Sequence, residues 1–303
     1  MNKALILTDG KAGHENQSKA FARALGYDFD IFEIHFKSKF HKALSYVFDH
    51  LNIRTRSLLR STSTSTFDSS YRVVIGTGSG TFYAAKTVAK KLGVKCGVVL
   101  YPRGYDISTF DCILAPAFDN PRKAPNVIEI PANLVAADEA FYEKGVAAYR
   151  ERTDVEPEIA VIIGGPNKCS TMSVEWTRQK LDEIFKLPGK KAVTTSRRTP
   201  PEVEALVDSY PCDYKLIYSK DHFNPIPAFV KLAKKLYVTA ESTGMLSEAC
   251  TFGSAEVIAL DNLNPGPHKF RRFVENLRAG GYVDGNRKVD LSAEFAKAKD
   301  LLK

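Results

Sequence analysis

The 303-residue chain has no paired cysteines. Its five cysteines stand singly and no C-x-x-C pair occurs, so the sequence predicts neither a zinc ribbon nor a thioredoxin-type site. An odd, scattered set is also untypical of a secreted disulfide framework. These residues are Cys96, Cys112, Cys169, Cys212 and Cys250.

Long apolar runs are missing as well. The opening stretch MNKALILTDG has only a few apolar residues before Asp9, too few for a signal peptide or a membrane span. We therefore expect a cytoplasmic protein, attached to the inner membrane at most peripherally.

The chain also lacks common metal and nucleic-acid signatures. Its six histidines form no H-x-x-x-H motif, and no D-x-D pair follows an expected strand, so we expect no metal. No helix-turn-helix or RRM pattern is found, so we expect no nucleic-acid partner. The net charge of +8 by itself fits an anionic ligand, an acidic membrane surface or nucleic acid, and does not choose among them.

What the sequence does contain is an alternation of short β-branched runs with helical stretches. This pattern is typical of parallel sheets with helices on both faces. We predict an α/β protein of two Rossmann-like, doubly wound domains that face each other across a cleft. The expected strands are 4–8, 29–34, 71–75, 96–100, 111–115 and 126–130 in the first half, and 158–163, 191–195, 214–218, 235–239 and 256–260 in the second.

The division between the halves is predicted near residue 155. A helix over 133–152 is followed by the polar, proline-containing segment 153–157. The expected domains are therefore 1–154, on the acceptor side, and 155–266, on the donor-nucleotide side. Residues 267–303 read as helices that pack back on the first domain, by analogy with glycosyltransferase-B folds.

Segment 40–60 forms an insertion in the first half. Apolar residues recur at helical spacing from Phe40 to Leu51, with basic residues around and after them, including Arg54, Arg56 and Arg60. One interpretation is a helix that faces the core, followed by a linker. The others are a surface that docks on an anionic membrane and a surface that binds a protein partner. The serine- and threonine-rich run 61–66 reads as a loop.

The first candidate motif, DGKAGHENQ, directly follows the strand 4–8 and precedes a helix expected at 18–25. Its glycines permit close backbone approach, and the helix N-terminus beyond them favours an anion. Asp9 and His14 are candidate bases; a purely structural alternative makes Asp9 and Asn16 helix caps. The remaining candidates in the motif, on the acceptor side, are Gly10, Lys11, Gly13 and Asn16.

Three further motifs follow expected strands. The turn 76–81 contains Gly76, Gly78, Ser79 and Gly80, and either binds phosphate or acceptor or simply makes a tight connection; the P-loop lysine is absent. Gly164 and Gly165 form a second glycine turn, which we expect to bind the phosphates of the nucleotide. Arg197 and Arg198 are suited to phosphate oxygens, with a surface ion pair as the alternative.

The last motif, TAESTGMLSEA, opens a helix after the strand 235–239. Free N–H groups at Ser242, Thr243, Gly244 and Met245 suit a diphosphate, and Glu248 is placed one turn later to accept from a ribose. The alternative is a Ser–Glu capping arrangement without a ligand.

Together, DGKAGHENQ, GTGSGTF, YPR, APAFD, IIGGPNK, SRRTP and TAESTGMLSEA resemble, in order, the Elm-type mitochondrial fission family. The resemblance implies a glycosyltransferase-B-like fold. It also implies, for plant members, a link to mitochondrial division through recruitment of a dynamin-related protein. Arg103, which ends YPR, is grouped with the acceptor-side loops.

A more distant similarity is to the enzyme that adds N-acetylglucosamine to the undecaprenyl-linked peptidoglycan precursor. By that similarity Gly13-His14 lies on the acceptor side and supplies the base, and Ser242–Glu248 holds the donor nucleotide. Three departures weaken the match. Ala12 replaces a glycine, the segment Ser242–Glu248 is shorter by two residues, and Pro166 removes an N–H donor from the second glycine turn.

Two functions follow from the sequence. The first is an inverting, metal-independent glycosyltransferase that takes a nucleoside-diphosphate sugar as co-substrate and needs no other cofactor. The second is a non-catalytic, membrane-associated adaptor of the mitochondrial-fission type, in which segment 40–60 meets an anionic membrane surface. The retained motifs favour the enzyme.

Overall fold

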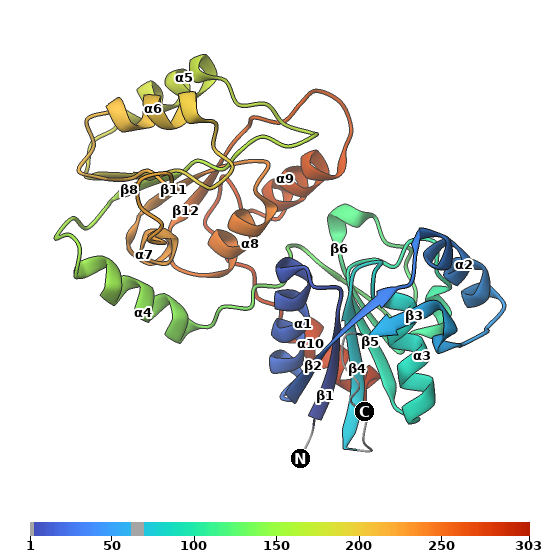
Figure 1. Cartoon of the computed structure of the whole chain (residues 1–303). Helices are drawn as coiled ribbons and strands as arrows, with labels where there is room; N and C mark the ends of the chain where they lie inside the picture. The colour runs from blue at the N-terminus through green and yellow to red at the C-terminus, as the bar shows by residue number, and fades with distance from the viewer. Residues whose placement is uncertain (1–2, 62–69) are drawn as a thin grey trace. The chain divides into compact units, whose positions relative to one another are not determined.

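The computed structural model describes residues 3–61 and 70–303. Its contacts divide the chain into two compact units (Figure 1). Unit 1 comprises Met1–Ala136 and Asp290–Lys303, and unit 2 comprises Ala137–Val289. From residue 62 on, the serine- and threonine-rich run lies outside the described residues.

Unit 1 is built on a seven-stranded sheet of order β3-β2-β1-β4-β5-β6-β7. All its strand pairs are parallel except β2 with β3, which is antiparallel. The six strands expected from the sequence are confirmed, and β3 is an addition too short to show a pattern. The strands are β1 Lys3–Thr8, β2 Asp28–Phe36, β3 Leu59–Ser61, β4 Tyr71–Thr77, β5 Lys95–Val99, β6 Cys112–Pro116 and β7 Val127–Ile130.

Helices cover both faces of this sheet because its central strands are apolar on both sides. In β1, Leu5 and Leu7 pack toward α3 (Phe82–Leu92), where α2 (Lys39–His50) also lies. Ala4 and Ile6 pack toward α1 (Ala12–Leu25) and α10 (Ser292–Leu301). Figure 1 shows α10 beside α1, as their contacts confirm.

The start of α1 differs from the expected one at residue 18. Gly10 takes a left-handed conformation with φ of 78°, and Lys11 is extended. The chain thereby turns sharply and becomes helical at Ala12. His14 and Asn16 thus lie inside the first turns of α1, not in a loop before it.

Unit 2 has a five-stranded, all-parallel sheet of order β10-β9-β8-β11-β12. The five expected strands are confirmed as β8 Ile159–Ile162, β9 Lys191–Thr194, β10 Tyr214–Leu216, β11 Lys235–Thr239 and β12 Glu256–Leu260. The helices are α4 Glu139–Arg150, α5 Val174–Phe185, α6 Pro201–Ser209, α7 Ile226–Leu232, α8 Thr243–Thr251 and α9 Lys269–Ala279. Helices α5 and α6 pack on one face of this sheet (Figure 1).

The division into units falls earlier in the chain than residue 155. The reason is α4, which packs extensively on α7 and therefore belongs to unit 2. The C-terminal segment is also divided between the two units. Helix α9 lies within unit 2, whereas Ala298 of α10 and Leu302, directly after α10, are buried in unit 1.

Among the described helices, none combines the length and the apolar character needed to cross a bilayer.

Candidate functional site

Each sheet has a point at which its strand order reverses. In unit 1 the chain runs from β1 to β2 on one side and then returns to β4 on the other; in unit 2 it leaves β8 for β9 and returns to β11. Open α/β sheets bind ligands at the carboxyl ends of the strands that flank such a point. The glycine-rich motifs predicted from the sequence stand at these two places.

In unit 2 the loops after β8, β9 and β11 touch one another directly. The Gly164 N–H donates to Thr239 Oγ1 at 2.9 Å, and the Gly165 N–H donates to Glu241 Oε1 at 2.8 Å. A Cβ atom on Gly165 would collide with the Arg198 backbone. These glycines therefore let three loops close up, and their N–H groups bond within the unit.

Glu241 is the organising residue of this edge. Its carboxylate is buried and also accepts from Thr239 Oγ1 at 3.1 Å and from Asn262 Nδ2 at 2.8 Å. Sequence reasoning missed Glu241, which stands one residue before the predicted phosphate-binding turn. The available signal was a carboxylate at a strand end opposite two successive glycines.

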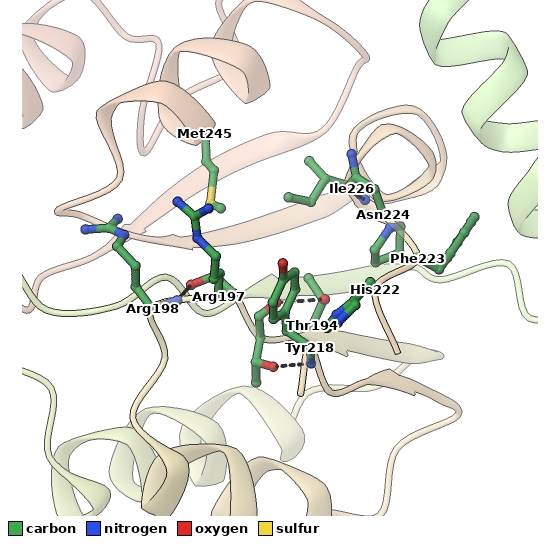
Figure 2. A pocket seen from close by; sticks show the side chains of 12 residues that line it. Thr194, Arg197, Arg198, Tyr218, His222, Phe223, Asn224, Ile226 and Met245 are labelled. Atoms are coloured by element: carbon green, nitrogen blue, oxygen red, sulfur yellow. Dashed lines mark hydrogen bonds between the residues drawn. The ribbon is translucent and has the colours of Figure 1, made fainter. Parts of the chain in front are cut away.

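A pocket of about 270 Å³ opens at the ends of β9 and β10. Figure 2 shows Arg197 extending from the end of β9 toward Met245 in the first turn of α8. Arg198 lies near the same end, whereas the rings of His222 and Phe223 lie at the other. The Tyr218 ring stands between these ends, with its centroid 4.6 Å from that of His222.

This pocket joins two kinds of recognition within unit 2. Guanidinium groups suit phosphate oxygens, and aromatic faces suit a planar base. The structure thus brings together Arg197, Arg198 and Met245 of the predicted residues. It adds Tyr218 and His222, which the sequence analysis did not single out.

The first turn of α8 offers backbone donors near the pocket. Ser242 precedes the helix, and its side chain makes no capping hydrogen bond, so the Ser–Glu capping alternative is not what the structure shows. The N–H groups of Thr243, Gly244 and Met245 lie in the turn whose amides have no intrahelical acceptor. They are placed to meet an anion.

Glu248 lies toward α4. Burial raises the pKa of its carboxyl, and the nearby Tyr142 hydroxyl partly offsets this. Tyr142 in turn stacks on Phe252, with ring centroids 4.4 Å apart. In the structure Glu248 therefore has a neighbour on α4 within unit 2, besides its predicted role toward a ribose.

In unit 1, Asp9 and His14 form a hydrogen-bonded pair at the end of β1. His14 Nδ1 lies 3.0 Å from Asp9 Oδ1, and Lys11 Nζ lies 2.5 Å from Asp9 Oδ2. Burial acts to raise the pKa of Asp9, but hydrogen bonds from Lys11 and His14 and their positive charges outweigh it, so the pKa is lowered. The Asp9 carboxylate thus faces the Nδ1 side of the imidazole.

The turn after β4 closes around this pair. A Cβ atom on Gly78, whose φ is 81°, would collide with the His14 ring, and one on Gly80 would lie 2.6 Å from Asp9 Oδ2. Gly76 is packed in the same way against Thr81. Gly78 and Gly80 are therefore needed for the approach of this turn to His14 and Asp9, and Gly76 is needed for its packing on Thr81.

Other predicted residues lie around this centre. Ser79 Oγ accepts from Lys42 Nζ at 2.8 Å, and Asn16 is exposed on α1. Arg103 donates to the Asp119 carbonyl. Gly10 and Gly13 flank the turn into α1.

One strained residue was not expected. Leu100, directly after β5 and before the YPR tripeptide, has φ of 73°. This left-handed conformation is unfavourable for a branched side chain, and such strain concentrates at functional sites. In residues 3–61 and 70–303, no three His, Cys, Asp or Glu side chains gather to hold a metal ion.

The sequence profile described as "Mitochondrial fission ELM1" matches residues 12–297. The chain belongs to the ELM1 mitochondrial fission family. An ELM1 relative from Arabidopsis thaliana, named mitochondrial fission protein ELM1, is 24% identical over 243 residues. The match covers 70% of this chain and 56% of that protein, so the chain spans little more than half the length of its plant ELM1 relative.

Solved structures similar to this ELM1-family chain share its fold. Arabidopsis thaliana UGT89C1 complexed with UDP gives a TM-score of 0.54 at 10% identity, covering 100% of this chain and 90% of that one. A putative UDP-N-acetylglucosamine 2-epimerase from Listeria monocytogenes gives 0.52 at 12% identity, covering 99% and 87%. They confirm a glycosyltransferase-B-like fold of two Rossmann-like domains for this ELM1-family chain.

Proposed function

We propose that this ELM1-family protein is an inverting, metal-independent glycosyltransferase that uses a nucleoside-diphosphate sugar. The observation that carries the proposal is the pocket in unit 2, where two arginines, an aromatic wall and the first turn of α8 meet. The similarity in fold to proteins whose titles name UDP or a UDP-sugar supports the choice of ligand class.

The donor would bind with its base against Tyr218 and His222. Its diphosphate would lie between Arg197, Arg198 and the N–H groups of Thr243 and Gly244, which supply positive charge without a metal. Gly164 and Gly165 would contribute by holding these loops together. Glu248 would accept from a ribose hydroxyl.

The transfer step would use the pair in unit 1. His14 Nε2 would take the proton of the acceptor hydroxyl, whose oxygen would form a bond to the anomeric carbon of the sugar. The bond from that carbon to the diphosphate oxygen would break, and the nucleoside diphosphate would leave with the electron pair. Asp9 would hold the imidazole through Nδ1 and stabilise its charge.

Calorimetric titration with UDP, GDP, ADP and their sugars tests the binding step. We expect one nucleotide to bind, and we expect Arg197→Ala and Arg198→Ala to weaken it at least about tenfold, since each removes a charge-assisted contact. Arg178→Ala, an exposed arginine on α5 outside the pocket, is the matched control. Binding by none of the nucleotides would contradict the proposal and leave the adaptor as the remaining function.

Turnover separates an enzyme from a nucleotide-binding adaptor. Release of nucleoside diphosphate from the bound sugar nucleotide should fall by about 10²–10⁴ in His14→Ala, the range expected for loss of a general base. Nucleotide affinity should stay unchanged, because His14 belongs to unit 1. Full activity in the presence of EDTA is expected for a metal-independent enzyme.

A further inference from the structure

Helix α2 in unit 1 presents its apolar side to solvent. Phe40, Val47 and Leu51 are 71%, 54% and 63% exposed, and they share one helical stripe because they are seven and four residues apart. Ser45 and Asp49, on the opposite side, are buried. Leu44 and Phe48, between the two sides, pack partly against the core. The helix therefore faces the core with one side, as the core-facing interpretation expected, and leaves this apolar stripe exposed on the other.

A buried ion pair fixes this orientation. Asp49 Oδ1 lies 2.8 Å from Lys86 Nζ of α3, and both side chains are almost completely buried. Arg54 NH2 adds a second cation 3.3 Å from the same carboxylate. An unpaired buried carboxylate is costly, so α2 is not free to rotate its stripe inward. Arg54, expected to meet a membrane, is instead part of the interior.

A cationic pocket of about 340 Å³ lies at the N-terminal end of α2. Lys37, Lys39 and Arg60 line it, and none of them has an ion-pair partner among the residues that the structure describes. Lys42 and Lys11 also line it, but they bond to Ser79 and Asp9. Asp9 itself is part of the wall, so the pocket adjoins the proposed base.

We infer that α2 and this pocket form one docking site for an anionic lipid bilayer. The stripe of Phe40, Val47 and Leu51, with the exposed Ile53 after it, would enter the interface between headgroups and acyl chains. The pocket would hold a phosphate headgroup by its charge. The further idea that this headgroup is part of the acceptor substrate rests on the proposed function. The docking on a bilayer does not depend on it.

Charge and area favour a membrane over a second copy of the chain. A bilayer surface rich in anionic lipid complements Lys37, Lys39 and Arg60, whereas two copies would bring the same cations together. Four exposed apolar side chains also fall far short of the roughly 20–30 residues that each partner contributes to a stable protein interface.

Vesicle flotation with the full chain tests the inference. We expect binding to vesicles of phosphatidylcholine with phosphatidylglycerol and much less to phosphatidylcholine alone. The triple variant Lys37→Gln, Lys39→Gln, Arg60→Gln should partition onto the anionic vesicles about 100-fold more weakly, since each lost charge weakens binding about fivefold. The matched control removes two exposed lysines and an exposed arginine from unit 2, Arg178→Gln, Lys186→Gln and Lys190→Gln, and should keep most of the binding.

A second variant tests the stripe. Phe40→Gln, Val47→Gln and Leu51→Gln replace exposed side chains, so thermal unfolding should be unchanged while vesicle binding is lost. Nucleotide titration of the same variant should match the unmodified protein, which keeps a failure here separate from a failure of the proposed function.

Three outcomes would overturn the inference. One is vesicle binding that survives either triple substitution. Another is a dimer by light scattering that the glutamine variant turns into a monomer, which would assign the stripe to a second copy. The third is that NMR detects binding of soluble glycerol phosphate at Lys37 and Lys39 while the protein does not bind vesicles.

Discussion

The Gly165 N–H donates to the Glu241 carboxylate across 2.8 Å, joining the ends of β8 and β11 at the point where the strand order of unit 2 reverses. Because both groups are buried, the bond fixes the loops on which the arginines and the first turn of α8 are carried. The positions of the groups proposed to bind the ligand in unit 2 thus depend on Glu241, which would not itself touch the ligand.

Gly165→Ala should destabilise unit 2. The new methyl group would collide with the Arg198 carbonyl, and overpacking of this kind costs about 1–3 kcal/mol. Gly244→Ala, on the exposed first turn of α8 with open space around it, should instead be neutral or gain about 0.5–1 kcal/mol. Urea unfolding of the two variants measures the difference; equal effects would contradict the packing argument.

Replacing Lys86 alone should lower the free energy of unfolding far more than replacing Lys86 and Asp49 together. Lys86→Met leaves Asp49 buried with less compensation, for which about 3–5 kcal/mol is expected. The double variant Lys86→Met, Asp49→Leu should recover at least about 1 kcal/mol relative to the sum of the single changes. A double-mutant cycle on unfolding free energies checks this, and strict additivity would show that the pair is not coupled.

Glu248 should make stability fall as pH rises above the ordinary carboxyl range. Burial raises its pKa, so the folded protein holds the proton more tightly than the unfolded chain does. Its contribution is therefore complete at low pH and is lost as pH increases through the raised pKa. Glu248→Gln should remove this decline and be more stable than the unmodified protein at neutral pH. The exposed Glu143→Gln serves as the control in unfolding series from about pH 4 to about pH 8.

The neutral His14 ring should carry its proton on Nδ1. Asp9 accepts there, which fixes the tautomer and leaves Nε2 unprotonated. In Asp9→Asn the amide can either donate or accept, so both tautomers become populated. Imidazole ¹⁵N shifts distinguish these states. If the ¹⁵N shifts place the proton of the neutral ring on Nε2, His14 cannot act as the proposed base.

Much of the fold was predictable because parallel strands buried on both faces appear as continuous apolar runs. All eleven expected strands are present. Among the strands that the structure describes, only β3 is an addition, since its three residues depend on pairing with β2. The start of α1 was missed because Gly10 and Lys11 make the turn without a capping side chain.

The site was predictable at the level of loops rather than contacts. The motifs showed which strand ends carry glycines and arginines, but Glu241 acquires its partners from Gly165, 76 residues away, and Asn262, 21 residues away. Likewise, periodicity showed that α2 is amphipathic. The side that faces inward is decided by Lys86, 37 residues beyond Asp49.

Helix α10 gives unit 1 a particular place in the order of synthesis. Ala298 of α10 is fully buried, and Leu302, directly after α10, packs near Gly97 of β5. The part of unit 1 that precedes unit 2 in the chain therefore lacks part of its core until α10 has been synthesised after unit 2. Unit 2 is continuous from Ala137 to Val289 and has no such dependence. Of the two units, the one whose synthesis begins first is therefore completed second. Until α10 is made, the surface on which α10 will pack is left uncovered.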